Sequence, residues 1–176
     1  MIETPRLVLR RFREEDREPF AAMNADPRVG DWLGGAIDRA ASDAMLDRIN
    51  AHIDEHGWGL WAAELKVSGR LVGFIGLGHV AAGALPVGPA VEMGWRLSHD
   101  AWGQGLATEG AKAALDWALI HIEMKEFIAF TAATNLASQG VMRKIGMVAD
   151  PSRDFDHPRL AADHPLNRHV VYVASR

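Results

Sequence analysis

A glycine-rich turn between a strand pattern and a helix pattern is the part of this sequence best suited to chemistry. Residues 90–97 have the strand pattern, Trp102-Gly103-Gln104-Gly105 follows, and an apolar helical stripe covers 103–122. Glycine lets a backbone approach a ligand closely, and the first N–H groups of a helix lack intrahelical acceptors. Such donors, with the helix dipole behind them, bind phosphate groups. The segment therefore predicts a site for a pyrophosphate-sized anion.

Two well-known phosphate-binding loops do not fit this turn. A P-loop ends in Gly-Lys-Ser/Thr, whereas Gly105 is followed by Leu106-Ala107, which offer neither a lysine nor a hydroxyl for Mg²⁺. The dinucleotide fingerprint needs a third glycine three residues after the second, and Gly110 comes too late. Both nucleotide-binding interpretations are therefore set aside.

Composition limits the remaining classes. The chain has 176 residues, 48% of them hydrophobic, which predicts one domain spanning 1–176. It has no cysteine, which excludes a disulfide framework, a thiolate metal site and a cysteine nucleophile. Its formal net charge of −4 argues against a duplex nucleic acid as partner. No segment has the ~20 apolar residues of a membrane span, so we expect a cytoplasmic protein without a membrane partner.

The apolar periodicity predicts the elements that position the turn. Strands are expected at 7–12, 60–65, 71–77, 90–97, 127–132 and 170–173, and helices at 13–25, 38–56, 103–122 and 136–145. In the second helix, apolar residues recur every four positions, at Ile37, Ala41, Met45, Ile49 and Ile53. Strands before, between and after the last two helices predict an α/β fold with an α+β mixed sheet.

In their order, these motifs resemble the GNAT superfamily of N-acetyltransferases. The segment from Trp102 to Glu109, after the strand from Glu92 to Leu97, looks like the family's acetyl-CoA pyrophosphate motif, and Asn135 to Met147 resembles its later helix. The opening from Thr4 to Arg10 is similar to the RimJ/RimL-like branch of ribosomal-protein N-terminal acetyltransferases. This resemblance covers essentially the whole chain. It implies a central, mostly antiparallel sheet flanked by helices.

The resemblance also implies acetyl-CoA as cosubstrate and a primary amine, on a protein N-terminus or a small molecule, as acceptor. The implied cofactor contacts are Trp95, Arg96, Leu97, Trp102, Gly103, Gln104, Gly105, Leu106, Ala107, Thr108, Asn135, Ser138 and Arg143. Arg143 could neutralise the 3′-phosphate of CoA or lie on a solvated helix face. Two positions depart from the family: Trp102 replaces a frequent Arg or Gln, and Met142 replaces a frequent proton-donating Tyr.

Acetyl transfer to an amine needs a base, an oxyanion donor and a proton for the leaving thiolate. Glu92 is the candidate base, although a strand carboxylate could equally pair with an Arg or Lys. Ser138 is the candidate proton donor, although it could instead cap its own helix. A backbone N–H near 95–97 is the expected oxyanion donor. Because Met142 has no proton to give, a non-catalytic acyl-CoA-binding module is the alternative function.

Histidines and tryptophans leave further possibilities open. The segment from Asp154 to His169 contains neither an H-x-x-x-H helix nor an H-E-x-x-H motif, so we expect no metal there and none as a cofactor. Its His157 and His164 are read as structural first and acceptor-side second. Six tryptophans include Trp32, Trp58 and Trp61, which could pack in the core or contact the acceptor. The expected assembly is a monomer or a homodimer.

Overall fold

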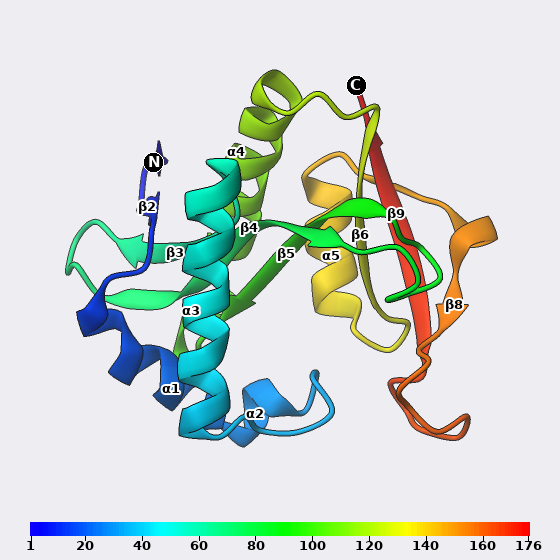
Figure 1. Cartoon of the computed structure of the whole chain (residues 1–176), viewed down its shortest axis with the longest axis horizontal. Helices are drawn as coiled ribbons and strands as arrows, with labels where there is room; N and C mark the ends of the chain where they lie inside the picture. Colours follow the sequence, from blue (N-terminus) through cyan, green and yellow to red (C-terminus); the bar gives the residue numbers. More distant parts are fainter.

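The computed structural model describes all residues 1–176 and contains one nine-stranded sheet with helices on both faces (Figure 1). The strands are β1 (Ile2–Glu3), β2 (Leu7–Arg10), β3 (Leu60–Leu65), β4 (Leu71–Val80), β5 (Ala90–Leu97), β6 (Glu126–Ala132), β7 (Val148–Ala149), β8 (Phe155–Asp156) and β9 (Arg168–Ser175). Their order is β1-β2-β3-β4-β5-β6-β9-β7, with β8 on β9. Only β5 and β6 pair in parallel, which confirms a mixed, mostly antiparallel sheet.

The helices connect these strands. They are η1 (Glu14–Asp16), α1 (Arg17–Ala25), α2 (Pro27–Gly30), α3 (Arg39–His56), η2 (His99–Ala101), α4 (Leu106–His121), α5 (Leu136–Lys144) and η3 (Pro151–Arg153). None of them is long and apolar enough to cross a membrane.

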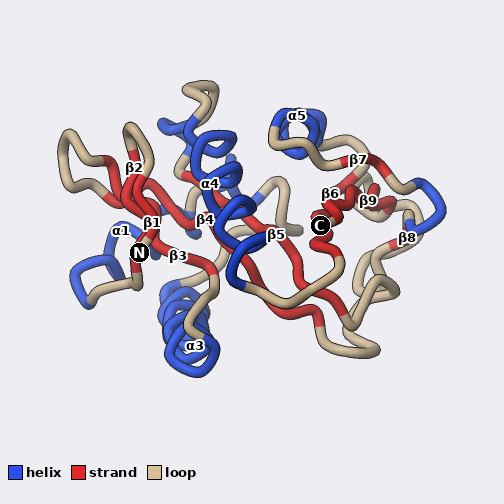
Figure 2. The backbone as a smooth tube through the Cα atoms, turned by 90° about the horizontal axis from the view of Figure 1, so that it is seen from above, coloured by secondary structure: helices blue, strands red, loops and turns tan.

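Two cores lie on opposite faces of the sheet. Neighbouring strand residues point to opposite faces, and along β4 Phe74 joins a cluster with α1 and α3 while Ile75 joins a cluster with α4. Figure 2 shows α3 and α4 on either side of the strands. Gly110 brings α4 close to the sheet, because a Cβ there would lie 2.4 Å from Ile75 Cδ1. The fold thus fixes where α4 begins relative to β5.

The parallel strands β5 and β6 share a single registered pair, Glu92 with Ile128. Figure 1 shows the two strands diverging beyond it. β5 leads through η2 into α4, and β6 leads into α5, so both helices begin near the carboxyl ends of the diverging strands. Ligands of α/β sheets bind at this kind of edge.

Most predicted elements are confirmed, two of them to the residue: β3 and β5. In α3 the Asp38 side chain accepts a hydrogen bond from Ala41 N–H, and Gly57 ends the helix at φ 76°. The four-residue spacing in α3 is confirmed in part: Ile49 is buried, and Met45 and Ile53 pack partly buried against the cores, whereas Ala41 is exposed. The buried residues of the helix are Ser42, Leu46 and Ile49, and Ser42 Oγ accepts a hydrogen bond from buried Asn24 at 2.9 Å. β4 also runs past its predicted end, to Val80.

Candidate active site

The turn before α4 presents a row of free donors. Gly103 and Gly105 have φ values of 71° and 76°, a left-handed conformation that side chains disfavour. The backbone N–H groups of residues 103–108 donate no hydrogen bond to a protein acceptor, and no side chain caps α4. Consecutive free amides at a helix start fit a pyrophosphate. The segment has the free donors that such a site needs, and the anion site itself stays a prediction.

Two side chains of the turn stabilise it through hydrogen bonds to nearby backbone carbonyls. Trp102 Nε1–H donates to the Leu97 carbonyl at 2.8 Å, and the Gln104 amide donates to the Asp100 carbonyl at 2.7 Å. The contacts implied for Trp102 and Gln104 would therefore come from their main chains. Trp102 thus ties the turn to the end of β5.

A clamp that sequence reasoning missed joins the N-terminus to this turn. Thr4 Oγ1 donates to Glu109 Oε1 at 2.6 Å, and Arg6 donates to the same carboxylate from its backbone N–H and its Nε. Arg6 Nη1 also donates to the Gln104 carbonyl at 2.9 Å. Burial raises the pKa of Glu109, but the bonds from Thr4 and Arg6 outweigh it and hold that pKa below its usual value. The only sequence signal was the Thr4-Pro5-Arg6 opening, which says nothing about its partner.

Glu92 lies at the point where β5 and β6 begin to diverge. It is partly buried, and its carboxyl group has no hydrogen-bond partner or ion pair in the protein. Burial raises its pKa to about 8, with no charged neighbour contributing. The alternative interpretation, an exposed strand carboxylate paired with Arg or Lys, does not describe this residue. A carboxyl group with this pKa gains or loses its proton as the pH passes through about 8.

Arg96, further along β5, faces the other way from the phosphate turn. Its Nη1 donates to Asn24 Oδ1 at 2.7 Å, its guanidinium lies 5.3 Å from the Phe74 ring centroid, and burial lowers its pKa to about 10. The side chain thus packs with α1 and α3, opposite α4. A cofactor contact from Arg96 would have to be made by its backbone. Its neighbours Trp95 and Leu97 pack in the α4-side core.

At the start of α5, one residue caps the helix and another has a free hydroxyl that could donate a proton. Asn135 Oδ1 accepts the Ser138 N–H at 3.1 Å and so caps the helix, while the Ser138 hydroxyl has no protein partner. Met142 is 1% exposed and belongs to the α4-side core. Arg143 donates to the Tyr172 hydroxyl at 3.0 Å. Of these four residues, Ser138 has the free hydroxyl.

A comparison of the sequence with protein families decides the class. The profile described as "Acetyltransferase (GNAT) domain" matches residues 6–148, most of the chain. The chain belongs to the GNAT acetyltransferase family. It is an acetyl-CoA-dependent N-acetyltransferase, and the resemblance seen in the sequence is confirmed.

Curated relatives of this GNAT enzyme include the uncharacterized protein YkkB of Bacillus subtilis, 28% identical over 82% of this chain and 83% of that protein. The FsC-acetyl coenzyme A-N(2)-transacetylase of Aspergillus fumigatus is 28% identical over 83% of this chain and 64% of its own length. Among solved structures, an acetyltransferase from Agrobacterium tumefaciens is 26% identical, with a TM-score of 0.79 over 99% of this chain and 94% of that one. RimJ of Mycobacterium smegmatis, at 19% identity and a TM-score of 0.74 over 96% and 81% of the two chains, shares the fold.

The histidines of the C-terminal loop of this GNAT chain hold the loop. His164 Nδ1 accepts the Leu166 N–H at 3.1 Å, and His169 stacks on Phe155 with ring centroids 5.2 Å apart. Burial lowers the pKa of His169, so its neutral form is favoured. These contacts favour the structural interpretation of the segment from Asp154 to His169.

The tryptophans and cavities lie mostly away from the turn. Trp61 is buried against Trp117, so it is a core residue and not an acceptor contact, whereas Trp32 is 39% exposed. Two surface hollows, of about 300 and 600 Å³, lie between α1 and β4 and between α4 and β9. Neither is lined by Glu92 or by residues 103–108. The candidate active site is therefore located by the free amides of residues 103–108 and by the point where β5 and β6 diverge.

Proposed function

We propose that this acetyltransferase moves the acetyl group of acetyl-CoA directly to a primary amine, using the Gly103–Thr108 amides for the pyrophosphate and Glu92 as base. The observation that carries the proposal is a row of free backbone donors at the end of the strand that holds a partnerless carboxyl group. Because the chain has no cysteine, no cysteine can carry the acetyl group between donor and acceptor.

The residues around the diverging strands divide the work of binding. The amides of 103–108 would hold the pyrophosphate, and Asn135 and Ser138 at the start of α5 would face the pantetheine arm. Arg143, exposed on the last turn of α5, offers a positive charge to the 3′-phosphate. Main-chain groups at 95–97 would contact the thioester.

Proton transfer sets the order of events. An alkyl amine with a pKa near ~10 arrives mostly protonated, so a base must remove a proton before attack. Glu92, with a pKa raised to about 8 by burial, accepts a proton more readily than an ordinary carboxylate. The amine nitrogen then bonds to the acetyl carbon, a backbone N–H at 95–97 stabilises the oxyanion, and the C–S bond breaks. The Ser138 hydroxyl gives its proton to the departing thiolate and is reprotonated by the excess proton of the acetylated nitrogen, so the products are the amide and the free CoA thiol.

Two acceptor classes fit this chemistry. The opening from Thr4 to Arg10 and the shared fold with RimJ favour the α-amino group of a protein N-terminus. The name of the Aspergillus relative, a transacetylase at an N(2) position, favours a small-molecule amine. Release of free CoA thiol from acetyl-CoA is the measurement that separates them, with N-terminal peptides and small amines as parallel panels. CoA binding without turnover on either panel would leave the non-catalytic module as the better function.

The cofactor site has its own test. Gly105→Val should abolish CoA binding measured by calorimetry, because a branched side chain would crowd the free amides and strain a left-handed residue. Gly69→Val is the matched control, since Gly69 is also left-handed, at φ 66°, but lies in the hairpin turn between β3 and β4. Equal CoA affinity of the two variants would refute the assigned pyrophosphate site.

A further inference from the structure

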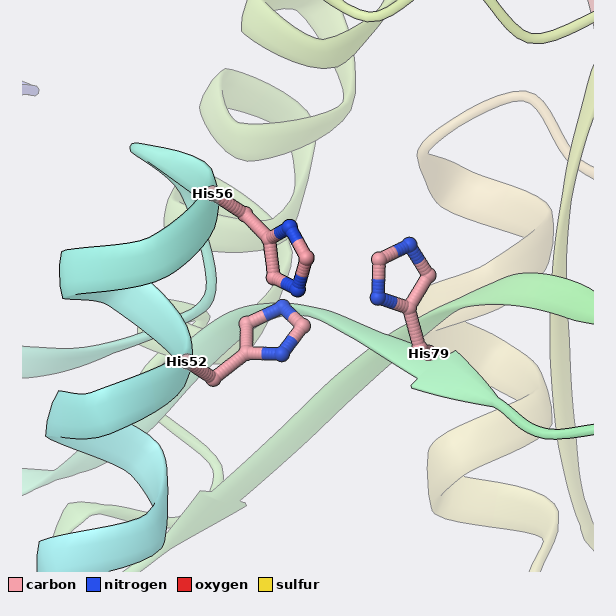
Figure 3. Close-up of side chains that lie close together, drawn as sticks. All are labelled: His52, His56 and His79. Carbon is pink, nitrogen blue, oxygen red and sulfur yellow. The ribbon is translucent and has the colours of Figure 1, made fainter.

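Three histidines from two elements come together on the side of the molecule where α3 ends. His52 and His56 lie one turn apart on α3, and His79 lies near the end of β4 (Figure 3). One ligand nitrogen of each lies within 4.8 Å of those of the other two. The sequence contains an H-x-x-x-H pattern here, from His52 to His56, which lies outside the segment 154–169. Its third member is distant in sequence and could not be assigned without the fold.

The fold produces this cluster through the extra length of β4. β3 pairs with β4 only as far as Gly76, whereas β4 continues to Val80 beside β5. The part of β4 beyond β3 has a free edge, and the last turn of α3 with the following Trp58 lies against it. Ring centroids of Trp58 and His79 are 4.7 Å apart, and those of Trp58 and His52 are 5.0 Å apart. The three rings therefore share one aromatic neighbour.

We propose that His52, His56 and His79 form a site for a divalent transition-metal ion such as Zn²⁺, with a fourth coordination position open to water. Imidazole nitrogen is a preferred ligand of Zn²⁺, Cu²⁺, Ni²⁺ and Co²⁺, and three protein ligands with one open position are a common arrangement for zinc. The site is independent of the proposed acetyl-transfer chemistry.

The protonation of the cluster suits a metal. Burial, followed by the positive charge that the other histidines would carry, lowers the pKa of His52. Burial and His56 lower the pKa of His79 in the same way. Both shifts favour the neutral imidazole, which is the form that binds metal ions. The carboxylate of Glu55 is the acidic group facing the cluster, with Oε2 3.8 Å from His56 Nε2.

A buried nitrogen points to the same conclusion independently. His52 Nε2 is inaccessible to solvent and has no hydrogen-bond partner in the protein. A buried polar atom without a partner is costly, and most such atoms in proteins are satisfied. A metal ion would provide the missing partner. Zinc–nitrogen bonds of about 2.0–2.1 Å place tetrahedral ligands about 3.4 Å apart, which small rotations of the two exposed rings, His56 and His79, can reach from the present spacing.

The histidine cluster lies close along β4 to the residue that pairs with Glu92. On β4, His79 follows Gly78, which is paired with Glu92 on β5. A bound ion would join the end of α3 to the stretch of β4 that opposes the proposed base. It would therefore fix the helix on the α1 and α3 face of the sheet, opposite α4.

Metal binding is measured on the full chain after treatment with a chelator, by titration with Zn²⁺ in a calorimeter at pH 7.5. We expect one ion per chain. His79→Gln should weaken binding at least tenfold, and His56→Gln is a second variant that also removes an exposed ligand. His121→Gln is the matched control, because His121 also stacks on a tryptophan, Trp117, but lies outside the cluster. Metal-free thermal unfolding of each variant establishes that it is folded.

Tryptophan fluorescence gives a second measurement. If the histidines only packed against Trp58 and bound no metal, added Cu²⁺ would not quench this emission. Cu²⁺ should quench the emission of the wild-type chain, and Trp58→Phe should remove most of that quenching while leaving Zn²⁺ affinity within about threefold. No Zn²⁺ binding by the wild type would overturn the proposal. Equal affinity in wild type and His79→Gln would also overturn it, because the ion would then be held by the α3 pair alone.

Discussion

At the scale of single residues, the environment decides which groups can do chemistry. Glu92, on β5, has no partner and a pKa raised to about 8, whereas Glu109, in the first turn of α4, is held by Thr4 and Arg6 as an anion. The pKa values of these two glutamates, on adjoining elements, are thus shifted in opposite directions. The first suits a proton-transfer group, and the second suits a structural anchor.

Glu92→Gln tests the base. Turnover of the wild type should rise with pH through about 8 as Glu92 ionises, and the variant should lose about 10²-fold or more in kcat/KM together with that rise. Ser138→Ala is the comparison, because it should lower kcat without moving the pH profile. A pH–rate profile of Glu92→Gln that overlays the wild type would remove Glu92 from the mechanism.

The same residue predicts how stability depends on pH. Its folded-state pKa of about 8 exceeds the ordinary 4.5, so between these values the folded chain holds a proton that the unfolded chain has lost. Raising the pH through this window therefore destabilises the fold. Between pH 5 and 8 the melting temperature of the wild type should fall relative to that of Glu92→Gln.

At the scale of elements, the start of α4 is held by the N-terminus of the chain. Four hydrogen bonds from Thr4 and Arg6 reach Glu109, which directly follows the free amides, and the carbonyl of Gln104, which lies among them. They fix the orientation of the helix start without occupying its donors. Arg6 and Thr4 are positioning residues, since they act on the turn and not on the substrate.

Arg6→Met should raise the KM for acetyl-CoA several-fold with little change in kcat, because the amides lose their fixed orientation. Arg11→Met is the control. Arg11 forms an ion pair with Asp54 and is 51% exposed at its side chain, against 49% for Arg6, but the pair lies away from α4. Exposed ion pairs contribute little to stability, so the melting temperature of Arg11→Met should stay close to wild type. Glu109 is only 17% exposed at its side chain, so Arg6→Met should lower the melting temperature more. An unchanged KM in Arg6→Met would argue against the clamp.

At the scale of the molecule, a buried ion-pair network joins the sheet to the elements that cover one of its faces. Buried Arg10 joins β2 to η1 and β3, donating to Asp16 at 2.6 and 3.0 Å and to Glu64 at 2.7 Å. Asp16 and Arg10 are 3% and 6% exposed. This network holds the sheet edge against the α1 and α3 layer, on which the histidine cluster also depends.

Arg10→Met should destabilise the chain by about 3–5 kcal/mol, because it leaves the buried Asp16 carboxylate without its partner. Urea unfolding followed by circular dichroism measures this loss. Arg10→Met combined with Asp16→Asn should recover part of it, since the unpaired charge is then removed as well. A loss below 1 kcal/mol in the single variant would mean that water or Arg13 replaces Arg10 beside these carboxylates.

The sequence by itself determined the fold class, most element positions, the glycine-rich turn before α4 and the family, because these depend on local spacing: glycines before a helix, caps at Asp38 and Asn135, and period-two strands. Tertiary structure decided what depends on partners distant along the chain. The Arg6–Glu109 clamp, the orientation of Arg96 and the histidine cluster each join segments whose meeting follows from strand register and length. The pKa of Glu92 belongs to the same group, since burial sets it and no local pattern encodes burial.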